Sequence, residues 1–230
     1  MAGDEKASNA MTSRLERMFQ YACESSLRLS ESSPIWIDVG AYLGTETIQS
    51  AKENSALQVY AFEPNLRLAA QYWGALQNFT VIPVAIAETD GFSDFYINAN
   101  TGASSLLPLN PSGLRRWIGG EVLKVESKVR VPTMRLDTFM KWMGISRVEY
   151  LKVDAQGTDL AVVRSAGERI KDIKKITLEV AITPISLYKG AATRADVIEF
   201  FECKGFNLVG VETQTHGQEE NLTFISSNTK

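Results

Sequence analysis

The sequence contains few of the features that mark several large classes of protein. Its 230 residues include two cysteines, Cys23 and Cys203, far apart in the chain, which indicates reduced thiols of a cytoplasmic protein rather than a disulfide framework. No apolar run is long enough to span a membrane. The net charge of -3 gives no support for a surface that binds nucleic acid or an anionic membrane. A hydrophobic content of 44% is enough for one buried core.

The first ten residues, MAGDEKASNA, are small and polar and precede a second methionine, so we interpret residues 1–10 as a cloning remnant. Ser13 and Glu16 form a capping box ahead of apolar residues with helical spacing, which predicts an N-terminal helix in residues 11–33. Residues 34–230 are expected to form one domain with an insertion at about 92–132.

The chain is organised around the stretch IWIDVGAYLG. Residues 35–37 read as a buried strand and residues 45–54 as a helix, so Gly40 and Gly44 bracket a tight turn between them. The turn lacks the GxGxxG pattern with which a dinucleotide is bound. Asp38, just before the first glycine, would repel a diphosphate and attract an ammonium or sulfonium group.

A second acid follows at the end of the next apolar run, VYAFEPN. Glu63 is placed to accept hydrogen bonds from both ribose hydroxyls, and Pro64 would begin a helix over residues 65–77, with Leu66 and Trp73 among its inward side chains. Together, Asp38 and Glu63 fit S-adenosylmethionine.

The order of the predicted elements indicates the fold class. Residues 79–87 read as a third strand, and strands alternating with helices imply a right-handed parallel sheet that binds ligands at the carboxyl ends of its strands. Residues 92–98 and 123–132 alternate with period two and predict an antiparallel pair, joined in part by a turn-rich loop over residues 99–113. After that loop, Arg115, Arg116 and Trp117 form either an edge of a substrate site or a solvated turn.

The second half continues the alternation. Asp137 is expected to cap a short helix ending at Gly144, and a further helix covers residues 158–169. Lys152 and Glu179 fall inside predicted central strands, where a charge is costly unless paired. A Lys152–Glu179 ion pair that fixes strand register and a role in substrate binding are both open.

The chain ends in a capped helix over residues 193–204 and two strands, residues 206–211 and 221–226, too close together for anything but a hairpin. Its loop holds His216, the only histidine, which is either solvated or catalytic.

Over about residues 34–226 the sequence resembles the FkbM family of S-adenosylmethionine-dependent methyltransferases. The motifs that carry the resemblance, in chain order, are IDVGAYLG, FEPN, VIPVAIA, the Ser-Ser-Leu at 104–106, MRLDTF, LKVDAQGTDLAVVRSAG, ITLEV and ENLTFIS. The resemblance implies a class I methyltransferase fold, an α/β Rossmann-like three-layer sandwich with a mostly parallel seven-stranded sheet and an antiparallel last strand. It also implies methyl transfer, usually to a hydroxyl oxygen.

The resemblance assigns residues position by position. The cofactor-binding candidates are Asp38, Gly40, Tyr42, Gly44, Glu63, Pro64, Asn65, Val84 and Ala85, with Val84 and Ala85 on the adenine side. The substrate-binding candidates are Ser104, Ser105, Lys152 and, from a polar loop, Tyr188. The family's DxEGxE reads DAQGTD here, with Gln156 in place of the glutamate and Asp159 as the second acid, so we predict no metal.

The chemistry needs an aligned acceptor oxygen and a group to take its proton. Asp154 is the first candidate for orienting or deprotonating the acceptor and His216 the second, although Asp154 could instead hold the methionyl ammonium. The expected acceptor is a small molecule such as a sugar, glycolipid or secondary metabolite. Two other hypotheses are a noncatalytic nucleoside-binding protein with the same fold and a nicotinamide-dependent oxidoreductase.

Overall fold

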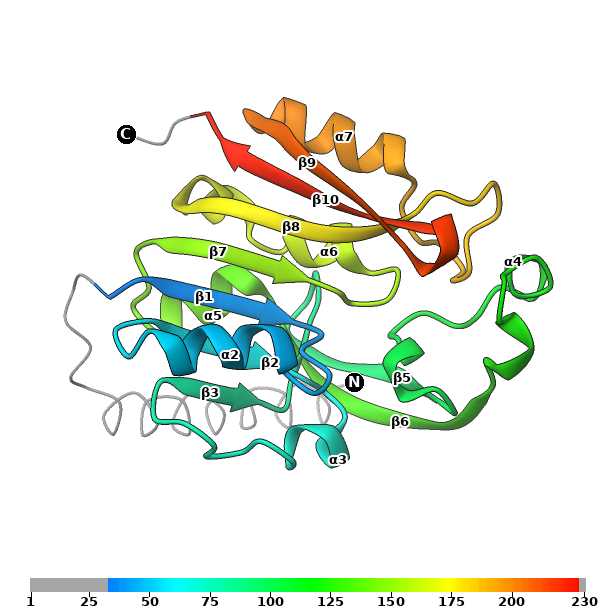
Figure 1. Cartoon of the computed structure of the whole chain (residues 1–230), viewed down its shortest axis with the longest axis horizontal. Coiled ribbons are helices and arrows are strands. Elements are labelled where there is room, and N and C mark those ends of the chain that lie inside the picture. The colour runs from blue at the N-terminus through cyan, green and yellow to red at the C-terminus, as the bar shows by residue number, and fades with distance from the viewer. Residues whose placement is uncertain (1–32, 228–230) are drawn as a thin grey trace, which may run out of the picture.

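The computed structural model describes residues 33–227, which form a three-layer α/β sandwich (Figure 1). The predicted N-terminal helix and the proposed cloning remnant lie outside the described residues. The central sheet has seven strands in the order β3-β2-β1-β7-β8-β10-β9. All neighbours in it are parallel except β10, which runs antiparallel to both β8 and β9. This topology confirms the predicted class I methyltransferase fold.

The strands of the main sheet are short and regular. They are β1 (Ile35–Val39), β2 (Gln58–Phe62), β3 (Phe79–Ile82), β7 (Val148–Val153), β8 (Ile173–Ala181), β9 (Phe206–Gln214) and β10 (Glu219–Ser226). The strand β2 is buried along its whole length. An apolar strand buried on both faces is the pattern expected of a parallel sheet covered by helices.

Helices cover the two faces of the sheet unequally. On one face, α2 (Thr45–Glu53) and α3 (Leu66–Ala69) pack near β1, β2 and β3 through a cluster that includes Ala51, Val59 and Phe79. On the other, α5 (Leu136–Trp142), α6 (Asp159–Arg164) and α7 (Arg194–Cys203) pack on the larger apolar core. In Figure 1, α2 lies in front of the sheet and α5 and α6 behind it.

The insertion forms a second, three-stranded sheet. It contains β5 (Gly91–Asn98) and β6 (Val125–Met134), the predicted antiparallel pair, together with β4 (Ala85–Ile86), which is parallel to β6. The expected single strand over residues 79–87 is therefore two strands in different sheets. The break falls at Pro83, which has no N–H to donate to a ladder. Between β5 and β6 lie η1 (Thr101–Ala103), α4 (Pro111–Leu114) and η2 (Gly120–Val122).

Two predicted helices are shorter than expected. The one over residues 65–77 is reduced to the four residues of α3, and Leu66 and Trp73, expected inward, are 67% and 63% exposed. Gly74 has a φ of 73°, a left-handed conformation that a helix cannot contain. The helix over residues 158–169 ends at Arg164 and gives way to η3 (Gly167–Asp172), with Gly167 at a φ of 54°.

At three places the side chains differ from a prediction or from one of the alternatives that the sequence left open. The N-cap of α5 is Arg135, and the Asp137 carboxylate accepts hydrogen bonds from the Arg135 guanidinium instead of capping the helix. Trp117 is buried in a small apolar cluster rather than solvated, although Arg115 and Arg116 beside it are exposed. Lys152 does not pair with Glu179, because strand register places it beside Asp38 on β1 and opposite Thr177 on β8.

The predicted C-terminal elements are confirmed. Thr193 and Asp196 form a reciprocal capping box at the start of α7. The strands β9 and β10 form the expected hairpin, joined by η4 (Thr215–Gly217). Among the described residues, no helix is both long and apolar enough to cross a membrane.

Candidate active site

A cleft lies where β1, β2 and β7 end, with an empty volume of about 680 Å³ when the open solvent at its mouth is included. Its walls come from the two strand-to-helix turns, from the start of the insertion and from the loop that follows Asp154. This is the edge at which open α/β sheets bind their ligands.

The cleft contains many of the predicted residues. Gly40, Tyr42, Glu63, Pro64, Val84, Ala85, Ser104 and Asp154 all line it. Apolar side chains from the insertion, Phe95 and Leu106, lie among the lining residues with Val84 and Ala85. Within the described part of the chain, the lining includes two carboxylates and no lysine, arginine or histidine. Such a cleft suits a cationic ligand and disfavours a diphosphate.

Glu63 is the best-defined acceptor in the cleft. It is 5% exposed, and its two carboxylate oxygens accept hydrogen bonds from the backbone N–H groups of Tyr42 at 2.9 Å and Asn65 at 2.8 Å. Burial raises the pKa of Glu63 to about 7, against the opposing effect of those two donors. Each oxygen keeps a further lone pair, so the carboxylate can also accept from a pair of hydroxyls.

Gly40 brings two strand ends together. Its φ is 75°, and a Cβ atom built there would lie 1.8 Å from the carbonyl oxygen of Asp154. The close approach of the loop after β7 therefore requires a glycine at this position, whether or not a ligand also approaches it. Gly44, at the N-cap of α2 with a φ of 62°, faces the Phe79 ring and does not line the cleft.

Asp38 supports the cleft from behind rather than lining it. The side chain is 1% exposed, and Oδ2 accepts a hydrogen bond of 2.5 Å from the Thr47 hydroxyl of α2. Oδ1 has no hydrogen-bond donor among the described residues and lies 3.7 Å from Nζ of Lys152. Burial raises the pKa of Asp38, with the Lys152 charge opposing that effect.

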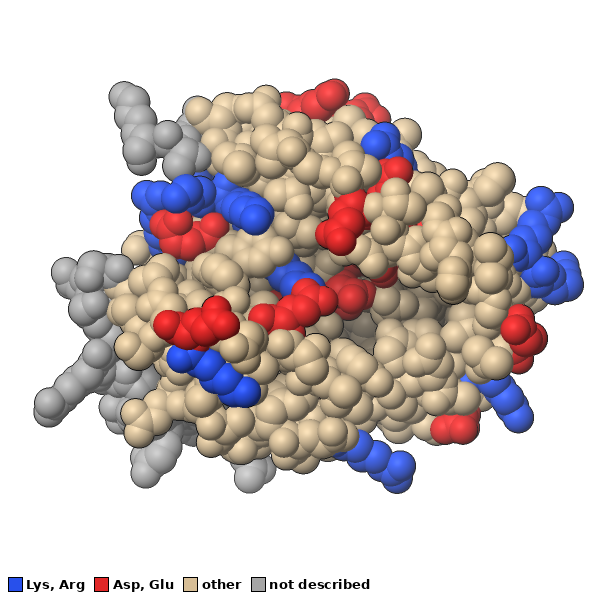
Figure 2. Space-filling view, viewed as in Figure 1, with Lys and Arg blue, Asp and Glu red and all other residues tan. Residues whose placement is uncertain are grey.

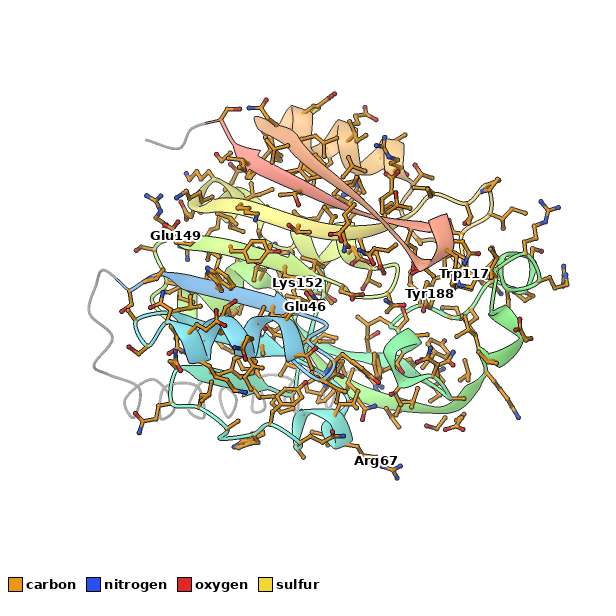
Figure 3. All side chains as sticks on the ribbon, viewed as in Figure 1. Glu46, Arg67, Trp117, Glu149, Lys152 and Tyr188 are labelled. Atoms are coloured by element: carbon orange, nitrogen blue, oxygen red, sulfur yellow. The ribbon has the colours of Figure 1, made fainter. Side chains whose placement is uncertain are left out.

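Lys152 is held among carboxylates on the α2 side of the sheet. Its Nζ is also 3.6 Å from the Glu46 carboxylate. Burial lowers the pKa of Lys152, but the charges of Asp38, Asp154 and Glu46 together raise it above the ordinary lysine value. Figure 3 shows Lys152 and Glu46 next to each other near the middle of the sheet, well away from Tyr188 and Trp117.

Gln156, absent from the predicted site residues, links several parts of the site. It has a φ of 52°, and its amide donates to Oδ1 of Asp154 at 2.7 Å and to the Glu179 carboxylate at 3.2 Å. The Tyr188 hydroxyl donates to its side-chain oxygen at 2.9 Å, and the Ser105 hydroxyl to its backbone oxygen at 2.7 Å. Burial raises the pKa of Glu179 well above the ordinary glutamate value, and the Asp154 charge adds to this effect.

The remaining predicted residues lie outside the cleft lining. Ser105 is 1% exposed and Tyr188 4%, and both hydrogen-bond to Gln156 from outside the cleft lining. The Asn65 side chain caps α3 by accepting from Arg67 N–H. His216 is exposed in the turn between β9 and β10 and is not among the residues that line the cleft.

The buried Asp159 could have been recognised from the sequence as structural. Its carboxylate accepts hydrogen bonds from the backbone N–H groups of Ala155 and Gly157, which fixes the loop that carries Gln156. Burial raises the pKa of Asp159 to about 7.

Comparison with known proteins identifies the class. The model of the methyltransferase FkbM domain matches residues 38–208, most of the chain, so this chain belongs to the FkbM methyltransferase family. It is a methyltransferase with a class I fold, as its sequence motifs predicted.

Individual proteins that are similar to this chain share only a small part of its sequence. The chain is 24% identical over 173 residues to the 2-O-methyltransferase NoeI of Sinorhizobium fredii strain NBRC 101917 / NGR234, covering 70% of this chain and 68% of that protein. Among solved structures, it is similar to the precorrin-6y C5,15-methyltransferase of Geobacter metallireducens, with 15% identity, a TM-score of 0.40 and coverage of 90% and 86% of the two chains. Fibrillarin of Aeropyrum pernix with bound S-adenosyl-L-methionine gives 13% identity, a TM-score of 0.47 and coverage of 86% and 69%.

Proposed function

We propose that this chain transfers a methyl group from S-adenosylmethionine to a hydroxyl oxygen of a small, polyhydroxylated acceptor. The observation that carries the proposal is the cleft with Glu63 on one wall, Asp154 on another and no cation among the residues between 33 and 227 that line it. The match to a 2-O-methyltransferase supports oxygen as the acceptor atom. The sparse, distant cysteines support a cytoplasmic enzyme.

The residues of the cleft fit S-adenosylmethionine. Glu63 has free lone pairs for the ribose hydroxyls, and Val84, Ala85, Phe95 and Leu106 offer apolar contacts to the adenine. Gly40 and Tyr42 would line the methionyl part. Asp38, with one buried oxygen lacking a hydrogen-bond donor, adds negative potential behind that part. The same field opposes the diphosphate of a nicotinamide dinucleotide, so the oxidoreductase hypothesis loses support.

When bound, S-adenosylmethionine supplies a methyl group already activated by a positive sulfonium. The protein then has to hold the acceptor oxygen in line and receive its proton. Asp154 would do the second task, because its carboxylate stands at the cleft with Oδ1 held by the Gln156 amide. Oδ2 is then the oxygen that would take the hydroxyl proton. Ser104, whose hydroxyl accepts from the Asn98 N–H, and Lys152 are the further acceptor-binding residues in this proposal.

The test separates binding from chemistry in the Asp154→Asn variant. Calorimetry with S-adenosylhomocysteine measures cofactor-site binding, and transfer of tritiated methyl from S-adenosylmethionine to a panel of soluble oligosaccharides measures turnover. We expect the variant to bind within a few-fold of the parent and to lose at least about a hundredfold in turnover, the usual scale of general base catalysis. His216→Ala, altered outside the cleft lining, is the matched comparison and should lose much less.

Each other outcome has a definite meaning. Loss of S-adenosylhomocysteine binding in Asp154→Asn would assign Asp154 to the methionyl ammonium instead of the acceptor. Full turnover in Asp154→Asn would remove its role as a base. Binding by the parent with no methyl transfer to any acceptor would favour the noncatalytic hypothesis, and no binding at all would refute the proposed function.

A further inference from the structure

A second hollow, larger than the cleft, lies on the α2 side of the sheet over β7, β8, β10 and β9. Its empty volume is about 1,240 Å³ when the open solvent above it is included. Among the described residues, the helices on this side pack against β1, β2 and β3, so the outer strands lie open (Figure 1). Figure 2 shows this face, with acidic side chains gathered around the middle of it. We call this hollow the polar groove.

The polar groove meets the cleft at Asp154. That residue lines both spaces, and Glu179, which shares the Gln156 amide with it, also lines the groove. A molecule lying in the groove could therefore present one group to Asp154 from the side opposite the cofactor. Of the four predicted substrate-binding residues, Lys152 lines the groove, whereas Ser104, Ser105 and Tyr188 do not.

The groove lining is rich in uncharged hydrogen-bonding groups. The hydroxyls of Thr177 and Thr223 lie 2.9 Å apart on neighbouring strands, and Gln214 and Asn221 contribute amides. Amides and hydroxyls both donate and accept, as the hydroxyl groups of a sugar do. Tyr150 adds an aromatic ring, with Nζ of Lys175 4.8 Å from its centroid.

The charges in the groove exclude other occupants. Its carboxylates are Glu46, Asp154, Glu179 and Glu212, and its cations are Lys152 and Lys175. Lys152 is already engaged by Asp38 and Glu46, and Lys175, which lies over the Tyr150 ring, is outnumbered by the carboxylates, so the net charge of the lining disfavours a phosphate, sulfate or carboxylate. Valines and one glycine are the apolar members, too few for a lipid chain.

We propose that the polar groove is the acceptor site and that its ligand is a neutral oligosaccharide, laid across β7, β8 and β10 with one hydroxyl at Asp154. The inference rests on the proposed function and adds to it the place and charge class of the acceptor. The groove exceeds the cofactor cleft in volume, which leaves room for more than one sugar ring.

The probe is a printed array of neutral, sulfated and carboxylated oligosaccharides, read with the labelled full chain in the presence of S-adenosylhomocysteine. We expect binding to neutral oligosaccharides. The double variant Gln214→Ala/Asn221→Ala should weaken it at least tenfold while S-adenosylhomocysteine binding stays within twofold. Asn207→Ala is the control, because this exposed amide lies on the same hairpin but outside the groove lining.

The outcomes that overturn the proposal differ from those that overturn the function. If S-adenosylhomocysteine binds and no neutral oligosaccharide does, or only anionic ones do, the assignment of the groove is wrong and the methyltransferase function stands. Undiminished binding in the double variant would place the acceptor elsewhere. A dimer that the double variant dissociates, without any glycan binding, would make this face a contact between copies. Failure of S-adenosylhomocysteine itself to bind would refute the underlying function.

Discussion

The protonation of Glu63 should control cofactor binding across neutral pH. Burial raises the pKa of Glu63 to about 7, and hydrogen bonds from two ribose hydroxyls would favour the ionised carboxylate. Roughly a tenth of the free protein has Glu63 ionised at pH 6 and roughly nine-tenths at pH 8. If the bound state requires the ionised form, the affinity for S-adenosylhomocysteine should rise about tenfold between these pH values.

The assay is calorimetry at pH 6, 7 and 8, in pairs of buffers with different ionisation enthalpies. Binding at pH 6 should release close to one proton, and binding at pH 8 almost none, because Glu63 is then already ionised. Glu63→Gln keeps the shape of the side chain and removes the titration, so any slope that remains in it belongs to the ligand or to other groups such as Asp159. An affinity that does not change with pH, or the same slope in Glu63→Gln, would refute the reasoning.

Two further predictions concern stability. Gly40→Ala should destabilise the fold by more than about 3 kcal/mol, since its Cβ would overlap the Asp154 carbonyl and its φ is 75°. Gly190→Ala, with a φ of 80° and no atom within 4 Å of the new Cβ, is the control and should lose about 1–2 kcal/mol; equal losses in urea unfolding would contradict the close approach. Glu179 has a folded pKa above its unfolded value, so the folded state binds the extra proton and stability should decline as pH rises from about 4.5 through neutrality. Glu179→Gln should reduce that decline by about 2 kcal/mol or more in thermal unfolding between pH 5 and 9, and an unchanged slope would show that Glu179 does not carry it.

The positions of these strands along the chain could be predicted from the sequence because each has a local signal. Apolar runs that end in an acid and precede a glycine or a proline gave β1, β2 and β7, and the short spacing of the last two strands required a hairpin. The predicted length of the helix after Glu63 was wrong. The apolar residues there have helical spacing, but Gly74 and the short return to β3 end the helix after one turn. The spacing of apolar residues does not show how far the chain has to travel to reach the next strand.

Which residues line the cleft could be predicted best where the backbone fixes their position. Gly40, Tyr42 and Glu63 line the cleft because a strand-to-helix turn and a strand end have fixed places in this topology. The positions of the Asp38 and Lys152 side chains were harder to predict, because the side of the sheet on which they lie depends on strand register. Alternation along β1 and β7 turns both toward α2, where they meet each other. The contribution of Phe95 and Leu106 required knowing that the insertion folds back over the cleft.

The glutamine in the DAQGTD motif explains how the site tolerates the loss of a family acid. A glutamate at position 156 would add a carboxylate beside Asp154 and Glu179, and these groups could be close only if they shared protons. Gln156 has two amide hydrogens, and it donates one to each of the two acids. The amide nitrogen faces the two acids, and the side-chain oxygen of Gln156 lies 2.9 Å from the Tyr188 hydroxyl. The Gln156 amide thus fixes the orientation of the Asp154 carboxylate, and no protonated acid is needed at position 156. The altered motif is therefore compatible with Asp154 acting as a base.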